Sequence, residues 1–122
     1  FIGFHVTQAL LARGERVIGI DNVNDYYDPR LKESRLAQIK SDQFTLHRLN
    51  IADREGLAAA LAGQDVTGVI HLAAQAGVRY SLINPYAYIE ANVMGHVVML
   101  ELARTFKNLK HFVYASSSSV YG

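Results

Sequence analysis

The sequence predicts an α/β protein with a doubly wound parallel sheet, in which helices cover both faces of the strands. Two observations indicate this class. Segments with helical spacing alternate regularly with short strand-like segments along all 122 residues. The strand-like segments are nearly continuous apolar runs, as expected for strands buried on both faces. Apolar residues make up 50% of the chain and charged residues 19%, a composition typical of a chain with a buried core.

The first half of the chain is expected to hold three helices and two strands. The stretch FIGFHVTQALLARG predicts a helix that ends at Gly14. The apolar run RVIGID then predicts a strand ending at Asp21. Pro29 suits the first turn of a second helix, PRLKESRLAQIK, and FTLHRLNI predicts the next strand. Asp53 is expected to cap a short alanine-rich helix.

The second half continues the alternation. VTGVIHLAA predicts a strand, and Asn84 with Pro85 opens a long helix over residues 85–106. Apolar residues repeat on that helix at spacings of four, four and three, namely Ile89, Val93, Val97 and Leu100. HFVYAS predicts the last strand. The long helix is also a candidate surface for a homodimer.

Composition argues against several classes of protein. The net charge is +1 with no basic stripe, which disfavours nucleic-acid binding. No apolar run reaches the length of a membrane span. The absence of cysteine fits a reducing compartment, so we expect a cytoplasmic protein. The five histidines show no metal spacing, and no metal site is expected.

Residues at the carboxyl ends of the predicted strands are the candidate ligand contacts. In open parallel sheets the ligand binds beyond these ends. The residues that close the four strands are Asp21, Asn22, Asn50, Ile51, Leu72, Ala73, Ala74 and Ser116–Ser119.

Asp21 has two interpretations. A carboxylate at the end of a strand, about 20 residues past a glycine-rich loop, binds the ribose hydroxyls of a dinucleotide, and Gly3 lies 18 residues before Asp21. Alternatively, Asp21 and Asn22 begin a turn, where both residue types are common.

The serine run in YASSSSVYG also has two interpretations. Serine-rich segments are often flexible linkers. Here the run closes a predicted strand, and because successive strand residues face opposite sides, part of it is expected to face the ligand crevice. A serine hydroxyl can donate and accept hydrogen bonds there.

The motifs FIG, VIGIDN, LNIAD, VIHLAAQAGV, NPYAYIEANVMG and FVYASSSSVYG, in this order, resemble the extended short-chain dehydrogenase/reductase family of sugar-nucleotide epimerases and dehydratases. Two stretches, DNVNDYYDPRLKESRL and AAQAGVRYS, are most similar to UDP-glucuronate 4-epimerases. The resemblance implies a partial NAD-binding Rossmann domain over residues 1–122, with the first strand and the C-terminal substrate part missing. We therefore expect a fragment that neither folds stably nor catalyses alone.

The resemblance also implies roles for single residues. NAD would contact Gly3, Asp21, Asn22, Asn50, Ile51, Leu72, Ala73, Ala74 and Asn92, where Asn50 replaces the aspartate usual in the family. Ser117 would be the catalytic serine, and Arg79, Ser118 and Ser119 would bind the nucleotide sugar. The resemblance implies that the family's catalytic tyrosine and lysine lie downstream of Gly122. Tyr121 is not that tyrosine, because it belongs to the SVYG motif.

The implied reaction is a 4-epimerisation, in which NAD takes a hydride from the sugar C4 and returns it to the other face. Two alternatives stay open. A 4,6-dehydratase of the same family would share these motifs, although Ser118 and Ser119 stand where many dehydratases carry an acidic pair. A non-catalytic NAD-binding regulator would keep the fold without the catalytic residues.

Overall fold

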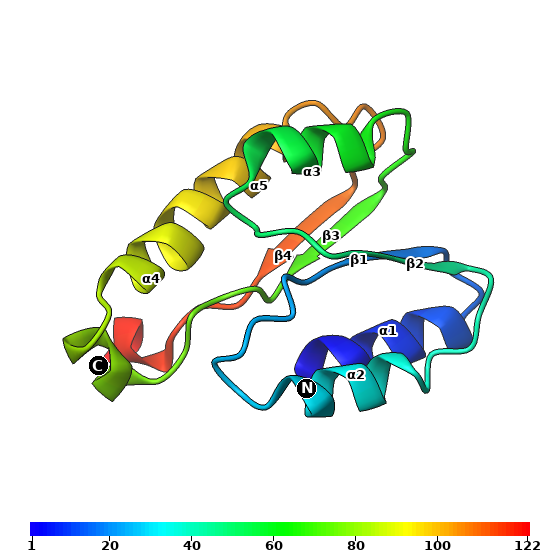
Figure 1. Ribbon diagram of the computed structural model, residues 1–122. Coiled ribbons are helices and arrows are strands. Elements are labelled where there is room, and N and C mark those ends of the chain that lie inside the picture. The colour runs from blue at the N-terminus through cyan, green and yellow to red at the C-terminus, as the bar shows by residue number, and fades with distance from the viewer. The chain divides into compact units, whose positions relative to one another are not determined.

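The computed structural model describes all 122 residues, and the chain divides into two compact units, residues 1–50 and residues 51–122. Each unit holds one pair of parallel strands with its own helices (Figure 1). The predicted alternation of helices and short parallel strands is therefore confirmed. That residues 1–122 form one partial domain stays a prediction.

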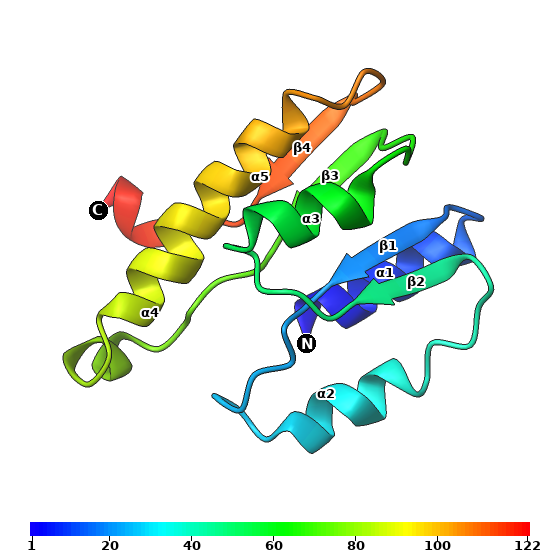
Figure 2. The same cartoon turned by 45° about the horizontal axis from the view of Figure 1, so that its top comes forward.

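The first unit contains two helices and two strands. In chain order these are α1 (Ile2–Ala12), β1 (Val17–Ile20), α2 (Pro29–Leu36) and β2 (Phe44–His47). Strands β1 and β2 pair in parallel, with Val17 opposite Phe44 and Ile20 opposite His47. Figure 2 shows α1 lying behind the two strands. Both strands therefore end at the same edge of this unit.

Local sequence rules explain where the helices of this unit begin and end. Gly14, with φ of +80°, follows α1 in a left-handed conformation that glycine adopts without strain, as predicted. Pro29 is the first residue of α2, and the side chain of Asp28 accepts a hydrogen bond from the Arg30 amide at 2.9 Å. The helix ends at Leu36, earlier than the sequence pattern indicated.

The second unit contains a longer series of elements. They are α3 (Arg54–Leu61), β3 (Gly68–His71), the 3₁₀ helix η1 (Val78–Leu82), α4 (Tyr86–Tyr88), the π-helix η2 (Ile89–Met94), α5 (Gly95–Ala103), β4 (His111–Tyr114) and the 3₁₀ helix η3 (Ser118–Tyr121). Strands β3 and β4 pair in parallel, with Gly68 opposite His111 and His71 opposite Tyr114. The Asp53 carboxylate caps α3 by accepting a hydrogen bond from the Gly56 amide at 2.9 Å, as predicted.

The core of the second unit lies between its strands and its helices. Helices α3 and α5 run along one face of the β3–β4 pair (Figures 1 and 2). The buried residues are Leu57, Leu61, His71, Gly95, Val98 and Met99. Ile70 and Val113 are exposed.

The predicted long helix is present, but its apolar stripe does not face the core. Segments α4, η2 and α5 follow one another without a gap. The four residues that define the stripe, Ile89, Val93, Val97 and Leu100, are all exposed. The helix instead packs through Gly95, Val98 and Met99. No helix in the structure combines the length and the apolar character that crossing a membrane requires.

Gly95 allows a close approach between the long helix and the segment after β2. A Cβ atom added at Gly95 would lie 2.4 Å from Cγ2 of Ile51, well inside van der Waals contact. Ile51 is half-buried at this contact. A glycine is therefore required where the helix meets this branched side chain.

Three strands end earlier than predicted. Strand β3 ends at His71, so Leu72, Ala73 and Ala74 follow it and are not part of it. Strand β2 ends at His47, so Asn50 and Ile51 lie in the turn that follows it. Strand β4 ends at Tyr114, and Ser118 and Ser119 lie in η3. The expectation that the serines alternate across a strand is therefore wrong. Its physical reason is local, because the hydroxyl oxygen of Ser117 accepts a hydrogen bond from the Ser119 amide at 3.2 Å and starts a turn.

Candidate functional site

The carboxyl ends of the strands carry the candidate residues in both units. In the first unit, Asp21 and Asn22 directly follow β1. In the second unit, the segment from Leu72 follows β3 and the segment from Ala115 follows β4, and the Ala115 amide donates to the His71 carbonyl at 3.1 Å. Because these strands are parallel neighbours, the segments leave the β3–β4 pair side by side.

The two carboxylate oxygens of Asp21 differ in their hydrogen bonds. Its Oδ1 accepts hydrogen bonds from the Val23 amide at 2.7 Å and from Nζ of Lys32 at 2.8 Å. Its Oδ2 accepts no hydrogen bond from the chain, and the side chain is 46% exposed. The two interpretations of Asp21 are thus compatible, because Oδ1 forms the turn and Oδ2 is left as an acceptor for a hydroxyl group.

A second ion pair lies in the same unit. Arg48, just after β2, donates to both oxygens of Glu33 at 2.7 Å and 2.9 Å. These hydrogen bonds lower the pKa of Glu33, and they raise the pKa of Arg48, with a smaller contribution from the charge of Asp21. Lys32 and Arg48 are therefore both paired with carboxylates.

The other cofactor candidates of this unit have weaker geometric support. Gly3 lies in the first turn of α1, and a Cβ atom added there would meet nothing within 4 Å. Asn22 accepts a hydrogen bond from the Asn24 amide at 3.2 Å, which leaves its amide nitrogen available. Asn50 is half-buried. The roles of these residues stay predictions from the resemblance.

The segment after β3 begins beside a buried histidine. His71 is 8% exposed, and its ring stacks on that of His96 from α5, with centroids 5.2 Å apart. Burial lowers the pKa of His71, and the charge of His96 lowers it further. His71 is thus a residue of the core of this unit. Leu72 and Ala73 then come to lie half-buried, and Ala74 is exposed.

Asn92 holds the loop that follows these small residues. Its Oδ1 accepts a hydrogen bond from the Gln75 amide at 2.7 Å, and its Nδ2 donates to the Gln75 carbonyl at 3.1 Å. One lone pair and one N–H of the side chain remain, so a contact between Asn92 and the cofactor stays a prediction. Tyr88, one turn earlier, donates its hydroxyl proton to the Gly77 carbonyl, a contact that the sequence pattern did not indicate.

The candidate substrate residues lie in exposed segments of the second unit. Arg79 lies in η1 and makes no hydrogen bond or ion pair with the chain. Ser117 precedes η3, and Ser118 and Ser119 form its first turn. All four side chains are open to solvent, so they are free to contact a polar ligand.

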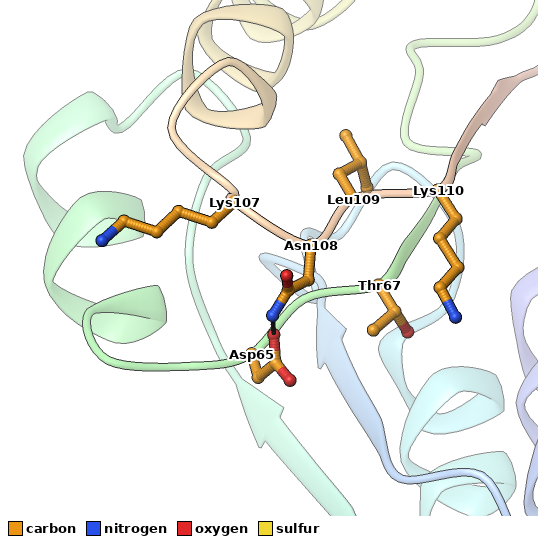
Figure 3. Close-up of a pocket in the computed structure, with 6 residues that line it drawn as sticks. All are labelled: Asp65, Thr67, Lys107, Asn108, Leu109 and Lys110. Carbon is orange, nitrogen blue, oxygen red and sulfur yellow. Dashed lines mark hydrogen bonds between the residues drawn. The ribbon is translucent and has the colours of Figure 1, made fainter.

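A shallow hollow lies at the opposite end of the β3–β4 pair. It has a volume of about 510 Å³ and is lined by Asp65, Thr67, Lys107, Asn108, Leu109 and Lys110 (Figure 3). Asn108 donates a hydrogen bond to Asp65 at 2.8 Å across it. Since its lining residues precede β3 and β4, the hollow lies at the amino ends of the strands, away from the expected ligand edge.

Comparisons with known proteins agree with the motif pattern. A family model described as GDP-mannose 4,6 dehydratase matches residues 1–122, the whole chain. The chain is 50% identical over 125 residues to a protein of Rhizobium meliloti named probable UDP-glucuronate 4-epimerase, and 46% identical over 122 residues to UDP-glucuronate 4-epimerase 4 of Arabidopsis thaliana. All of this chain is covered in both cases, but only 36% and 28% of the relatives.

A solved structure supports the same similarity. The chain matches the crystal structure of a UDP-glucuronic acid 4-epimerase from Bacillus cereus in complex with NAD, with a TM-score of 0.80 and 32% sequence identity. The match covers 100% of this chain and 38% of that structure. The chain thus spans about a third of the length of the proteins that it matches.

Proposed function

The chain belongs to the family described as GDP-mannose 4,6 dehydratase, and on this premise we propose that it is the NAD-binding part of a nucleotide-sugar 4-epimerase. One observation carries the proposal: in each unit, residues that the resemblance assigns to the ligand directly follow the carboxyl end of a parallel strand, namely Asp21 and Asn22 after β1 and Leu72–Ala74 after β3. The names of the relatives favour UDP-glucuronate and UDP-galacturonate as the substrate pair.

The residues at these strand ends fit NAD. Oδ2 of Asp21 is a free acceptor for a ribose hydroxyl, and a carboxylate there would repel the additional phosphate of NADP. The small side chains of Ala73 and Ala74 leave space for a flat ring system above the backbone. When bound, NAD would supply the reversible acceptor for a hydride.

Ser117 is the residue that we expect to act on the sugar. Its hydroxyl can hold the oxygen on C4 while that oxygen loses and regains its proton. Ser118 and Ser119 would contact other hydroxyls of the sugar, and the unpaired guanidinium of Arg79 would bind an anionic group such as the pyrophosphate or the sugar carboxylate.

A dehydratase activity is the second candidate, and the description of the matching family favours it. The serines at positions 118 and 119 favour the epimerase instead, because a hydroxyl cannot replace the carboxyl groups that many dehydratases carry there. The two activities give different products from the same substrate, so one assay separates them.

The exposed apolar stripe of the long helix supports the homodimer. Its four residues lie on one side of a helix, and each is at least 41% exposed. A second copy of the same stripe would cover them, since two helices with matching apolar rows pack together well.

The test is an assay of the whole protein with UDP-glucuronate, in which NMR identifies the product and the NAD content is measured after denaturation. Formation of UDP-galacturonate with retained NAD is expected. Ser117→Ala should lower kcat about 100-fold, whereas Ser34→Ala, on the exposed side of α2, should leave it unchanged. A 4-keto-6-deoxy sugar would indicate the dehydratase, and bound NAD without turnover of any nucleotide sugar would indicate a regulator.

A further inference from the structure

The loop that follows Leu72–Ala74, the predicted cofactor contacts after β3, is held by hydrogen bonds from the long helix. Both polar atoms of the Asn92 side chain are bonded to the backbone of Gln75, at 2.7 Å and 3.1 Å. A side-chain amide that accepts from the N–H and donates to the C=O of one residue makes the same pair of hydrogen bonds that an adjacent β-strand makes with a residue. The two residues are 17 positions apart in the sequence.

Tyr88 also holds this loop, two residues further along the chain from Gln75. Its hydroxyl donates to the Gly77 carbonyl and lies 3.2 Å from the Ala76 carbonyl oxygen. Residues four apart on a helix share a face, so Tyr88 and Asn92 reach the loop together. Asn92 lies in the π-helix η2, and such segments often occur at functional sites.

The loop needs this support because it makes a sharp change of direction. Gly77 has φ of +86°, and its carbonyl also accepts from the Tyr80 amide at 3.1 Å as η1 begins. Within four residues the chain passes from Ala74, a predicted NAD contact, to Val78 at the start of η1, and η1 carries Arg79. The loop therefore joins the cofactor residues to the substrate residue.

We propose that Tyr88 and Asn92 are positioning residues that hold residues 75–77 in one conformation, and that this conformation is needed for tight NAD binding. The second part rests on the proposed function. The first part does not, because it concerns only hydrogen bonds within the chain.

Hydrogen exchange in the whole protein tests the first part directly. Asn92→Leu removes both bonds to Gln75 and keeps a side chain of similar size, and Tyr88→Phe removes only the hydroxyl. We expect exchange at the Gln75 amide to be about tenfold faster in Asn92→Leu. Tyr86→Phe is the matched control, because Tyr86 is 82% exposed and donates no hydrogen bond to the loop.

The NAD dissociation constant of the same variants tests the second part. Asn92→Leu and Tyr88→Phe should each raise it about fivefold to tenfold, with the control unchanged. Asn92→Asp, which keeps the acceptor for the Gln75 amide but not the donor for its carbonyl, should fall between Asn92→Leu and the wild type in both measurements.

Three outcomes overturn the inference or limit it. Unchanged exchange at Gln75 in Asn92→Leu would disprove the positioning role. Faster exchange with an unchanged NAD dissociation constant would disprove the link to the cofactor. Wild-type protein that binds no NAD would refute the proposed function, while the exchange data would still decide whether Asn92 holds the loop. If Asn92→Leu fails to fold, Tyr88→Phe decides both parts.

Discussion

Nζ of Lys32 lies 2.8 Å from Oδ1 of Asp21, so a cation from α2 neutralises one oxygen of the carboxylate that ends β1. The other oxygen accepts no hydrogen bond from the chain. The pair is partly exposed, and its contribution to stability is therefore small. Its importance lies in the charge that a dinucleotide would meet at this edge.

Asp21→Asn should shift cofactor preference toward NADP. The substitution removes the negative charge that repels the 2′-phosphate and leaves Lys32 without its carboxylate partner. We expect the ratio of NADP to NAD affinity to rise at least tenfold in the whole protein, measured by calorimetry with each cofactor. Asp25→Asn, in the same loop and without a contact to Lys32, is the control, and an equal ratio in both variants would contradict the role of Asp21.

Burial of His71 predicts that stability falls in acid. Its folded pKa is lowered below the ordinary value of 6.5, first by burial and then by His96, while the unfolded chain keeps the ordinary value. Below pH 6.5 the unfolded state therefore binds the additional proton, and the free energy of unfolding decreases until the pH reaches the lowered folded pKa. Each unit of pKa difference costs about 1.4 kcal/mol.

Urea unfolding of the whole protein between pH 5 and 8 would measure this loss. His71→Gln should flatten the pH dependence, because glutamine does not titrate. Burial and the charge of His96 are the two causes of the lowered pKa of His71, and no carboxylate offsets them. His111→Gln, exposed at the start of β4, should keep the wild-type slope, and a slope that His71→Gln leaves unchanged would assign it to another group.

Gly95→Ala should destabilise the protein by about 1–3 kcal/mol. The added methyl group would lie 2.4 Å from Cγ2 of Ile51, a branched side chain with few alternative rotamers. Thermal unfolding measures the loss. Gly68→Ala is the matched control, since a Cβ atom there meets nothing within 4 Å, and equal effects of the two substitutions would show that the contact with Ile51 is not responsible.

Much of the fold could be predicted because local rules determine it. Gly14, Pro29 and Asp53 act on their own helix ends through backbone conformation and capping, and all three behave as expected. Which face of a helix points toward the core depends on tertiary packing, and local sequence rules do not determine it. The spacing of Ile89 and Val93 indicates an apolar stripe, but only the packing of Gly95 shows that the stripe faces outward.

The position of the charged candidate residue in the first unit could be predicted, whereas the loop of the second unit could not. Asp21 closes a strand, so its position follows from the strand pattern. The serines depart from that pattern because a hydroxyl at position 117 can bond the backbone two residues later and end the extended conformation. The contact of Tyr88 with Gly77 joins residues 11 apart across a turn and has no periodic signature.

The exposed stripe of the long helix predicts that the whole protein dimerises through it. Val93→Asp places a charge among apolar residues that a second copy would cover, so the dimer should weaken by at least tenfold in its dissociation constant, because an unpaired charge at an interface must lose its hydration. Analytical ultracentrifugation over a range of concentrations measures this change. Leu31→Asp, on α2, is the matched control, since Leu31 and Val93 are both 53% exposed. Wild-type protein that sediments as a monomer at high concentration would refute the dimer, and equal weakening by both substitutions would place the interface elsewhere.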